Sequence, residues 1–501
     1  MFTFNDIICI VLFIWLIYCY KYYQKVNKYP IGPRPLPFLG NCHQIDFVNF
    51  QEWIEKQSMI FGPIFTIFTP TPTVILMNYD LIKECFFDKQ SETSGRPLRN
   101  PEVLISMSQN SGISSSNGES WLEQRKGSLF FIRQLILKTN KIETSITIGV
   151  EEFLKYIEQS KNRGNLDITY ITKLFVTNTL HDIFFNYRYP SINNRPFKNF
   201  INNIELAWKK LENYKTYIVS QLIPFYPYLY HVIFAFTGQL VFKVNQMFRF
   251  IKDEVSKSKI LFNDNGRSKS FCEEYFKRIE IMKYQNTSYT LDNLESTTLN
   301  LFTSGYGVTN ELIKCCLYCL ADNQHIQKEM RKEINNLKEK NKLISIRDRL
   351  NLLYCNSVIY ELLRYINIQP FTYPHMTTKE IILNNHIIPV GTVVVGNLYN
   401  IHRNDKSFIH GDIIIPDRFI SPDTGKLNKQ LIEKLIPFGI GARKCIGEEI
   451  IIMKLFLLLT NIVKYYNIKN IDNDTIDTIQ HQFNSVAKVG TSKFIFENIH
   501  V

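Results

Sequence analysis

The sequence predicts a mainly helical protein with a small β region, and three observations support that fold class. Apolar residues make up 45% of the 501 residues, which is ample for a sizeable buried core. Helical apolar patterns broken by Gly, Pro and Asn fill most of the chain to about residue 290, and a long apolar-periodic stretch covers 291–323. β-Branched and aromatic residues predict short strands around a turn at 63–78, again at 380–396, and near the C-terminus.

The N-terminal segment has the composition of a membrane anchor. Residues 7–20 carry no charge, and Lys21, Lys25 and Lys28 follow them. Counted from Met1, the segment reaches the roughly 20 residues that a helix needs to cross a bilayer. A cleaved signal peptide would have a basic start and small residues at the cut, and neither is present. We therefore expect a single-pass transmembrane signal anchor over residues 1–20, with the bulk of the chain in the cytosol.

Two further segments bear on membrane association. Residues 21–41 are basic and contain four prolines, which predicts a stiff, extended hinge between the anchor and the globular part at 42–501. Residues 221–242 carry no formal charge, but Pro224, Pro227 and Gly238 argue against one continuous helix. We expect a loop there whose aromatic surface lies in the membrane interface.

Charge and cysteine content exclude some classes of protein. The net charge of +12 suits an anionic lipid surface or an acidic protein partner, but no basic run with interleaved aromatics indicates a nucleic-acid partner. The ten cysteines are scattered without zinc-ligand spacing, and Cys315, Cys316 and Cys319 fall within a helical pattern. This distribution indicates a reducing compartment rather than a disulfide framework.

One cysteine stands in a distinctive loop, PFGIGARKCIGEE, at residues 437–449. Cys445 is preceded by Arg443 and Lys444, and the apolar stretch 446–466 predicts a buried helix directly after it. A helix N-terminus and neighbouring cations lower the pKa of a thiol and favour the thiolate. Glycines on both sides permit a sharp turn and leave room for a flat group. The loop therefore predicts a thiolate ligand to a metal in a large planar cofactor.

The spacing Phe438-x-x-Gly441-x-Arg443-x-Cys445-x-Gly447 resembles the haem-binding loop of the cytochrome P-450 family. The resemblance implies the cytochrome P-450 fold, with haem b between a long I helix and the L helix. It also implies that Cys445 is the axial thiolate of the iron. Phe438 and Arg443 then contact the cofactor. The proline-rich stretch resembles the hinge of microsomal members, and residues 221–242 resemble the segment that borders the substrate entrance.

Other matches to the family occur in the expected order along the chain. Trp121 and Arg125 are four residues apart, so they share one helix face, and their family equivalents bind a haem propionate. His375 follows two prolines at the position where the family carries Arg or His for a propionate. By the same resemblance, Arg443 is a further propionate partner.

A Glu-x-x-Arg pair and a Pro-Asp-Arg-Phe segment predict a structural network. Glu361 and Arg364 lie on one helix face between apolar neighbours, and Arg418 lies in the second segment, where Asp417 replaces the usual Glu. A buried ion pair must be fully hydrogen-bonded, which argues for a specific structural role. In the resembled family these three residues support the haem loop and take no part in catalysis.

The predicted I helix departs from the family at residues 304–309, which read SGYGVT. The family's acid position holds Gly307 and its alcohol position holds Val308, so the usual proton relay is not carried over. Thr309 is the nearest catalytic candidate, but it lies one residue later, about 100° further around the helix. Gly305 and Gly307 could open a groove for oxygen beside the cofactor.

The resemblance implies a haem-thiolate monooxygenase of the endoplasmic reticulum membrane. It would insert one atom of O2 into a small lipophilic substrate with electrons from an NADPH-dependent flavoprotein reductase. We expect the reductase to dock near Arg443, Lys444 and Lys126, and the substrate to contact 96–117, the region around Gln221 and the I helix. Two alternatives remain open: a haem-thiolate isomerase or dehydratase that acts on an oxygenated lipid without a reductase, and a non-catalytic haem-binding homologue.

Overall fold

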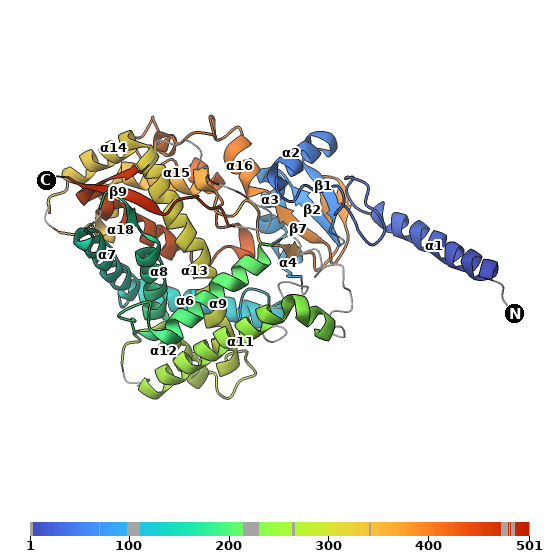
Figure 1. The fold of residues 1–501 in the computed structure, drawn as a ribbon, viewed down its shortest axis with the longest axis horizontal. Helices are drawn as coiled ribbons and strands as arrows, with labels where there is room; N and C mark the ends of the chain where they lie inside the picture. Colours follow the sequence, from blue (N-terminus) through green and yellow to red (C-terminus); the bar gives the residue numbers. More distant parts are fainter. Residues whose placement is uncertain are drawn as a thin grey trace.

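The computed structural model describes residues 4–69, 71–97, 111–161, 163–213, 230–262, 266–339, 342–471, 479, 481 and 486–499. It confirms a mainly helical fold with small sheets. Figure 1 shows most helices gathered in one part of the body, the four-stranded sheet at the opposite end, and the first helix projecting beyond that sheet. The helices of the larger part are α6 (Gly118–Leu137), α7 (Lys141–Gln159), α8 (Thr169–Phe185), α9 (Arg195–Leu211), α11 (Tyr230–Leu261), α12 (Phe271–Ile281), α13 (Leu291–Asp322), α14 (Gln324–Asn335), α15 (Leu353–Ile366) and α18 (Glu448–Tyr465).

The β region was correctly predicted at all three places. Strands β1 (Ile64–Phe68) and β2 (Pro72–Leu76) form the hairpin, and β2 pairs in parallel with β7 (Val393–Gly396), which pairs with β4 (His375–Met376). The remaining strands form two small sheets: β5 (Ile381–Leu383) with β6 (His386–Ile388), and β8 (Tyr466–Asn470) with β9 (Lys493–Asn498) and β3 (Leu166–Asp167). The shorter helices near the first sheet are α2 (Phe50–Phe61), α3 (Tyr79–Lys83), α4 (Gln90–Thr93), α16 (Leu398–Asn404) and α17 (Lys429–Lys434).

The first helix, α1 (Phe4–Val26), has the properties of a membrane-spanning segment. It is 23 residues long, has a mean hydropathy of 1.7 over its most apolar window, and buries none of that window against the protein. Its end at Val26 lies beyond the predicted anchor boundary, so Lys21 and Lys25 belong to the same helix. In the part of the chain that the structure describes, it is the one helix long and apolar enough to cross a membrane.

The proline-rich hinge packs against the first sheet. The Asn41 side chain donates to the carbonyl of Pro33 (2.9 Å) and accepts from the backbone N–H of Phe68 (2.7 Å). Gly32 lies so close to β1 that an added Cβ would be 2.0 Å from the carbonyl oxygen of Thr66. The second half of the hinge is therefore docked on the globular part.

The prediction of a loop over 221–242 is also wrong in part. Residues 230–242 belong to α11, and residues 221–229 lie outside the described part of the chain. Pro224 and Pro227 both precede the start of this helix, so neither ring removes one of its backbone hydrogen bonds. From Leu240 onward, α11 buries an apolar stripe that includes Val244 and Met247.

The central helix α13 spans almost the whole range that was predicted for it. Its N-cap is Thr290, whose side chain accepts from the N–H of Asn293, and its buried stripe forms part of the main core with α8, α9 and α18. Cys315, Cys316 and Cys319 are free, buried members of this core, as the helical pattern indicated.

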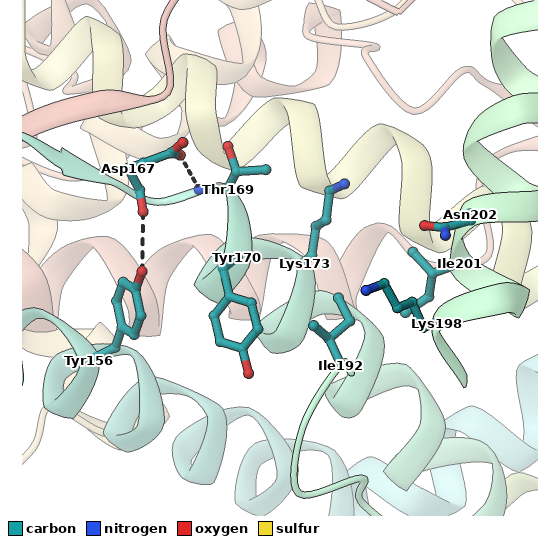
Figure 2. Close-up of a pocket in the computed structure, with 9 residues that line it drawn as sticks. All are labelled: Tyr156, Asp167, Thr169, Tyr170, Lys173, Ile192, Lys198, Ile201 and Asn202. Carbon is teal, nitrogen blue, oxygen red and sulfur yellow. Dashed lines mark hydrogen bonds between the residues drawn. The ribbon is translucent and has the colours of Figure 1, made fainter. Parts of the chain in front are cut away.

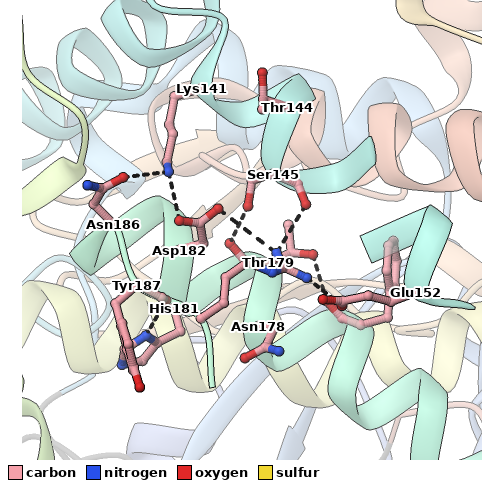
Figure 3. A network of polar contacts seen from close by, with 12 residues as sticks. Lys141, Thr144, Ser145, Glu152, Asn178, Thr179, His181, Asp182, Asn186 and Tyr187 are labelled. Carbon is pink, nitrogen blue, oxygen red and sulfur yellow. Dashed lines mark hydrogen bonds and ion pairs between the residues drawn. The ribbon is translucent and has the colours of Figure 1, made fainter. Parts of the chain in front are cut away.

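A polar network fixes α7 against α8, the helix that packs on α13 (Figure 3). Lys141 donates to the carboxylate of Asp182 (2.7 Å) and to the side chain of Asn186 (2.7 Å) at the C-terminal end of α8. Arg188 pairs with Glu152 of α7 (2.6 Å) and reaches Asp182 at 3.9 Å. Because Asp182 is nearly buried, its two cationic neighbours offset the cost of removing the carboxylate from water.

Candidate active site

The cysteine loop turns sharply ahead of α18. Gly439 and Gly441 have φ angles of +71° and +76°, values that favour glycine. A Cβ on Gly441 would lie 1.6 Å from the carbonyl oxygen of Phe86, so only glycine fits where the loop crosses that backbone. The N–H of Cys445 donates to the carbonyl of Phe438 (2.8 Å), and the N–H of Gly447 donates to the Cys445 Sγ (3.3 Å).

The predicted lowering of the Cys445 pKa is wrong for the protein without its cofactor. Burial raises the pKa of the thiol above its ordinary value, and this effect outweighs the opposing hydrogen bond from the N–H of Gly447 and the charge of Arg125. Arg443 and Lys444 do not offset the effect because both point elsewhere: Arg443 packs on Trp121, and Lys444 pairs with Glu448 (2.6 Å). A metal cation bound to the sulfur would favour its deprotonated form.

Cys445 opens onto an internal cavity of about 160 Å³. The cavity wall includes Phe438 from the same loop, Arg443, His375 and Arg96. The Cys445 side chain faces this cavity, and the surrounding protein desolvates the sulfur. The loop therefore presents one sulfur atom to a cavity whose rim is basic and aromatic.

Arg443 lies flat on an indole ring. Its guanidinium carbon is 3.6 Å from the centroid of the Trp121 ring, a cation–π contact. Its nitrogens donate to the carbonyls of Ser94 (2.8 Å) and Ser116 (2.7 Å). Burial, reinforced by the nearby charges of Arg96 and Arg125, lowers the pKa of Arg443 to about 8.

Two further arginines meet Arg443 without a counter-charge. Arg96 donates to the carbonyl of Pro374 (2.7 Å), and burial lowers its pKa to about 10. Arg125 donates to the carbonyl of Lys444 (2.5 Å). Within the described residues none of the three arginines forms an ion pair with a carboxylate, and the Nε of Arg96 and the indole N–H of Trp121 are buried without a hydrogen-bond partner.

His375 is held beside this group in its neutral form. It stacks on Phe86 with ring centroids 4.0 Å apart, and its Nδ1 donates to the carbonyl of Thr93 (2.9 Å). Burial, followed by the charge of Arg96, lowers its pKa well below the ordinary value. The Nε2 atom is therefore the nitrogen left for a ligand.

These residues fit the cofactor that the sequence predicts. Arg96 and Arg443 line the cavity, and Arg125 and the orphaned indole N–H of Trp121 lie near Arg443. Such donors suit two carboxylate groups. The cysteine sulfur lies on the same cavity, and nothing lies within 4 Å of the position that a Cβ on Gly439 would take. Haem carries two propionates, a flat ring and an iron that accepts a thiolate.

The predicted network of Glu361, Arg364 and Arg418 is present. Both oxygens of the Glu361 carboxylate accept from Arg364 (2.8 Å each), and Arg418 approaches the same carboxylate at 3.1 Å. Glu361 and Arg364 are completely buried. Nη1 of Arg364 donates to the carbonyls of His402 (2.6 Å) and Gly411 (2.7 Å), and Nη2 also donates to the carbonyl of Ile413 (2.9 Å).

This network reaches the cysteine loop through His402. The carbonyl of His402 accepts from Arg364 (2.6 Å), and its Nε2 accepts from the N–H of Ile436 (3.2 Å), the residue before the loop. Burial and the charges of Arg364 and Arg403 lower the pKa of His402 to about 3, which keeps Nε2 free to accept. The ion pair thus supports the loop through two hydrogen bonds.

One face of α13 is partly exposed, although most of the helix is buried. Leu301, Ser304, Gly305 and Val308 lie on this face, the open stripe, and retain exposure, and Ser304 is the most exposed. Thr309 faces away: it is 1% exposed, and its hydroxyl has no hydrogen-bond partner in the described structure. Thr309 and Val308 therefore lie on different faces of α13.

The two glycines of α13 accommodate neighbouring helices. A Cβ on Gly305 would lie 3.2 Å from Leu180 of α8, and one on Gly307 would lie 3.0 Å from the indole Nε1 of Trp208 on α9. Close helix packing is thus a role that the sequence did not predict for them. The predicted contact of Gly305 with the cofactor stays a prediction.

Sequence reasoning missed one site residue, and two predicted regions fall largely outside the described residues. The missed residue is Arg96, which the sequence places only in a substrate loop. It stands next to Pro97 with no acidic residue within three positions, and this absence of a local counter-charge was the signal that it binds an anion. The two regions are most of the predicted substrate segment 96–117 and the surroundings of Gln221. Arg443 also faces inward, which leaves Lys444 and the exposed Lys126 of the predicted reductase surface.

Comparison with known proteins agrees with this arrangement. The profile of the family described as "Cytochrome P450" matches residues 30–496. Cytochrome P450 2C21 of Canis lupus familiaris is 29% identical over 460 residues, which cover 90% of this chain and 91% of the relative. Cytochrome P450 2C70 of Rattus norvegicus is 28% identical over 474 residues, which cover 94% and 93% of the two chains. The chain therefore belongs to the cytochrome P450 family of oxidoreductases, which use haem with an axial cysteine thiolate.

Proposed function

We propose that the protein is a membrane-anchored monooxygenase that inserts one atom of O2 into a small lipophilic molecule, with electrons from an NADPH-dependent flavoprotein reductase. The observation that carries the proposal is a cavity lined by Cys445, Arg96 and Arg443, with the unpartnered N–H of Trp121 in the ring that stacks on Arg443. Bound there, haem would supply oxygen activation at its iron.

The residues around the cavity have distinct proposed roles. Cys445 is the axial ligand, and the Gly447 N–H orients its sulfur and tunes its charge. Arg96, Arg125 and Arg443 bind the propionates. The Trp121 N–H donates to one of them. Neutral His375 lies at the same edge with its Nε2 as a hydrogen-bond acceptor, and Phe438 lies against the cofactor from the loop side. Gly305 is the proposed contact from α13.

Proton delivery in this protein would differ from the usual family arrangement. Val308 has no exchangeable proton, and Thr309 is turned into the core. Ser304 is the exposed hydroxyl on the open stripe of α13, one helical turn before Val308, and is positioned to hold a water molecule there. We therefore prefer Ser304 to Thr309 as the proton-relay residue.

The departure at Gly307 and Val308 is also the observation that favours the second candidate, a haem-thiolate isomerase or dehydratase. One experiment distinguishes the two: the purified holoprotein is assayed on a panel of lipophiles with NADPH and reductase, and on lipid hydroperoxides without them. Oxygenated products that require NADPH support the monooxygenase. Conversion of hydroperoxides alone supports the isomerase and contradicts our proposal.

We further propose that α1 holds the protein in the endoplasmic reticulum membrane as a single span, with the catalytic domain in the cytosol. An unburied apolar helix with lysines at and just after its C-terminal end supports that orientation. Protease treatment of sealed microsomes tests it, because the catalytic domain should be digested without detergent. Protection of that domain would contradict the orientation.

A further inference from the structure

A second cavity, separate from the cysteine loop, lies between α7, β3, α8 and α9 (Figure 2). It measures about 400 Å³, which is within the range of small-molecule sites. The described residues of the cysteine loop take no part in its lining. No role in the oxidation reaction accounts for it.

The cavity combines flat aromatic walls with an apolar floor. The rings of Tyr156 and Tyr170 lie with centroids 5.9 Å apart and planes inclined by 31°. Their hydroxyl groups are already hydrogen-bonded, to the carbonyl of Asp167 (3.4 Å) and to Ser191 (3.3 Å), and both residues line the cavity. Ile192 and Ile201 are buried at its base.

Two lysines line the cavity on the side of α8 and α9, and they differ in their partners. Lys173 is ion-paired with Glu205 (2.7 Å), which also accepts from the hydroxyl of Tyr306 on α13. Lys198 is exposed, and within the described residues it reaches only the amide oxygen of Asn193, at a marginal 3.5 Å. A ligand anion therefore gains most from Lys198, with Lys173 as a second cation nearby.

Asp167, the one acidic residue that lines the cavity, lies at the end opposite the lysines, and its carboxylate is already hydrogen-bonded. Asp167 accepts from the N–H of Thr169 (2.8 Å) and from the hydroxyl of Ser492 (3.0 Å), and these bonds lower its pKa although burial opposes them. Figure 2 shows Asp167 at the β3 end of the cavity and Lys198 at the α9 end. Because the acid lies at one end of the cavity and Lys198 at the other, an anionic ligand would place its negative group toward α9.

We propose that this cavity is a second ligand site, distinct from the haem site, that binds a planar aromatic carboxylate. The carboxylate pairs with Lys198 and Lys173, and the aromatic body packs between Tyr156, Tyr170 and the two isoleucines. A neutral lipophile lacks the group that the lysines recognise, and a small aliphatic acid lacks the surface that the rings cover.

The test uses the holoenzyme with its haem site saturated by a lipophilic azole, so that the iron pocket is closed to the probe. Isothermal titration calorimetry with 2-naphthoate should then show one binding site, whose affinity falls as salt is raised. Lys198→Gln should weaken binding by about fivefold, and neutral 2-naphthamide should bind more weakly by a similar factor. Lys198→Arg, which keeps the charge, should restore most of the affinity.

Two matched variants separate the site from general surface effects. Lys209 is an exposed lysine of the same helix outside the cavity, so Lys209→Gln should leave binding unchanged. Asn202→Trp keeps both lysines but fills the cavity, and it should abolish binding. The proposal is overturned if 2-naphthoate does not bind the azole-saturated protein, if Lys198→Gln binds like wild type, or if 2-naphthamide binds equally well.

Discussion

The guanidinium carbon of Arg443 lies 3.6 Å from the centre of the Trp121 ring, which joins the cysteine loop to α6. The same arginine donates to the carbonyls of Ser94 and Ser116, so one side chain ties three segments around the haem site. Trp121 also has an indole N–H without a partner, so Arg443 and Trp121 together can bind a carboxylate.

Replacing Arg443 with Lys tests the importance of this geometry. Lys keeps the charge but loses the planar stack and the forked donors, and each lost charge-assisted hydrogen bond costs about 1.5 kcal/mol. We expect haem transfer to apomyoglobin to become faster by at least roughly tenfold. The control is Arg133→Lys, at an exposed position of α6, which should transfer haem at the wild-type rate.

Neutralising Glu361 should weaken the support of the loop. In Glu361→Gln two arginines remain buried beside an uncharged amide, and breaking a buried pair in this way costs about 3–5 kcal/mol. We expect a large loss of haem incorporation, measured as haem per chain after purification. Glu329→Gln removes an exposed pair with Lys332 and should cost less than about 1 kcal/mol, so equal losses in the two variants would contradict the argument.

His402 predicts a component of acid sensitivity. Its pKa is about 3 in the folded protein, below the ordinary 6.5, because burial and the charges of Arg364 and Arg403 oppose protonation. The unfolded chain therefore binds the proton first, so stability is retained above pH 6.5 and is lost as the pH falls below it. The loss is about 1.4 kcal/mol per pH unit.

The measurement is the free energy of unfolding of wild type and His402→Asn at pH 7, 6 and 5. The variant will be less stable at pH 7 because the N–H of Ile436 loses its acceptor, but its stability should fall less steeply with acid. His325→Gln, at an exposed position, is the matched control and should keep the wild-type slope. A wild-type slope in His402→Asn would show that this histidine does not titrate as proposed.

The orientation of α13 predicts opposite outcomes at adjacent residues. Thr309→Val removes a buried, unpartnered hydroxyl, so peroxide leakage per NADPH and stability should both stay near wild type. Val308→Thr places a hydroxyl on the open stripe, and Ser304→Ala removes the one there, so leakage should fall in the former and rise in the latter. A rise in leakage in Thr309→Val alone would restore Thr309 as the relay residue.

Local motifs are readable from the sequence because their spacing carries their geometry. Cys445 with its glycines, the Glu361–Arg364 pair at i and i+3, and Trp121 with Arg125 at i and i+4 can each be placed from spacing alone. Contacts between segments that are distant in the sequence cannot be predicted in this way. Arg96 meets Arg443 only after the chain has folded, and the link from His402 to Ile436 is a tertiary hydrogen bond.

The errors have related causes. The Cys445 pKa was predicted from sequence neighbours, but Arg443 packs on Trp121, and burial decides the direction of the shift. Gly307 leaves the acid position of the family without a side chain, and Trp208 of a distant helix, α9, fills that space. The start of α11 was missed because the prolines that precede it indicate a break in the whole segment.

The most direct test of the account is the spectrum of the reduced carbon monoxide complex in wild type, Cys445→Ala and Cys42→Ala. Cys42 is a partly buried cysteine near the first sheet and serves as the matched control. We predict the thiolate-type spectrum in wild type and Cys42→Ala, and its complete loss in Cys445→Ala. Survival of that spectrum in Cys445→Ala would show that another residue holds the iron and would contradict the assignment on which the account rests.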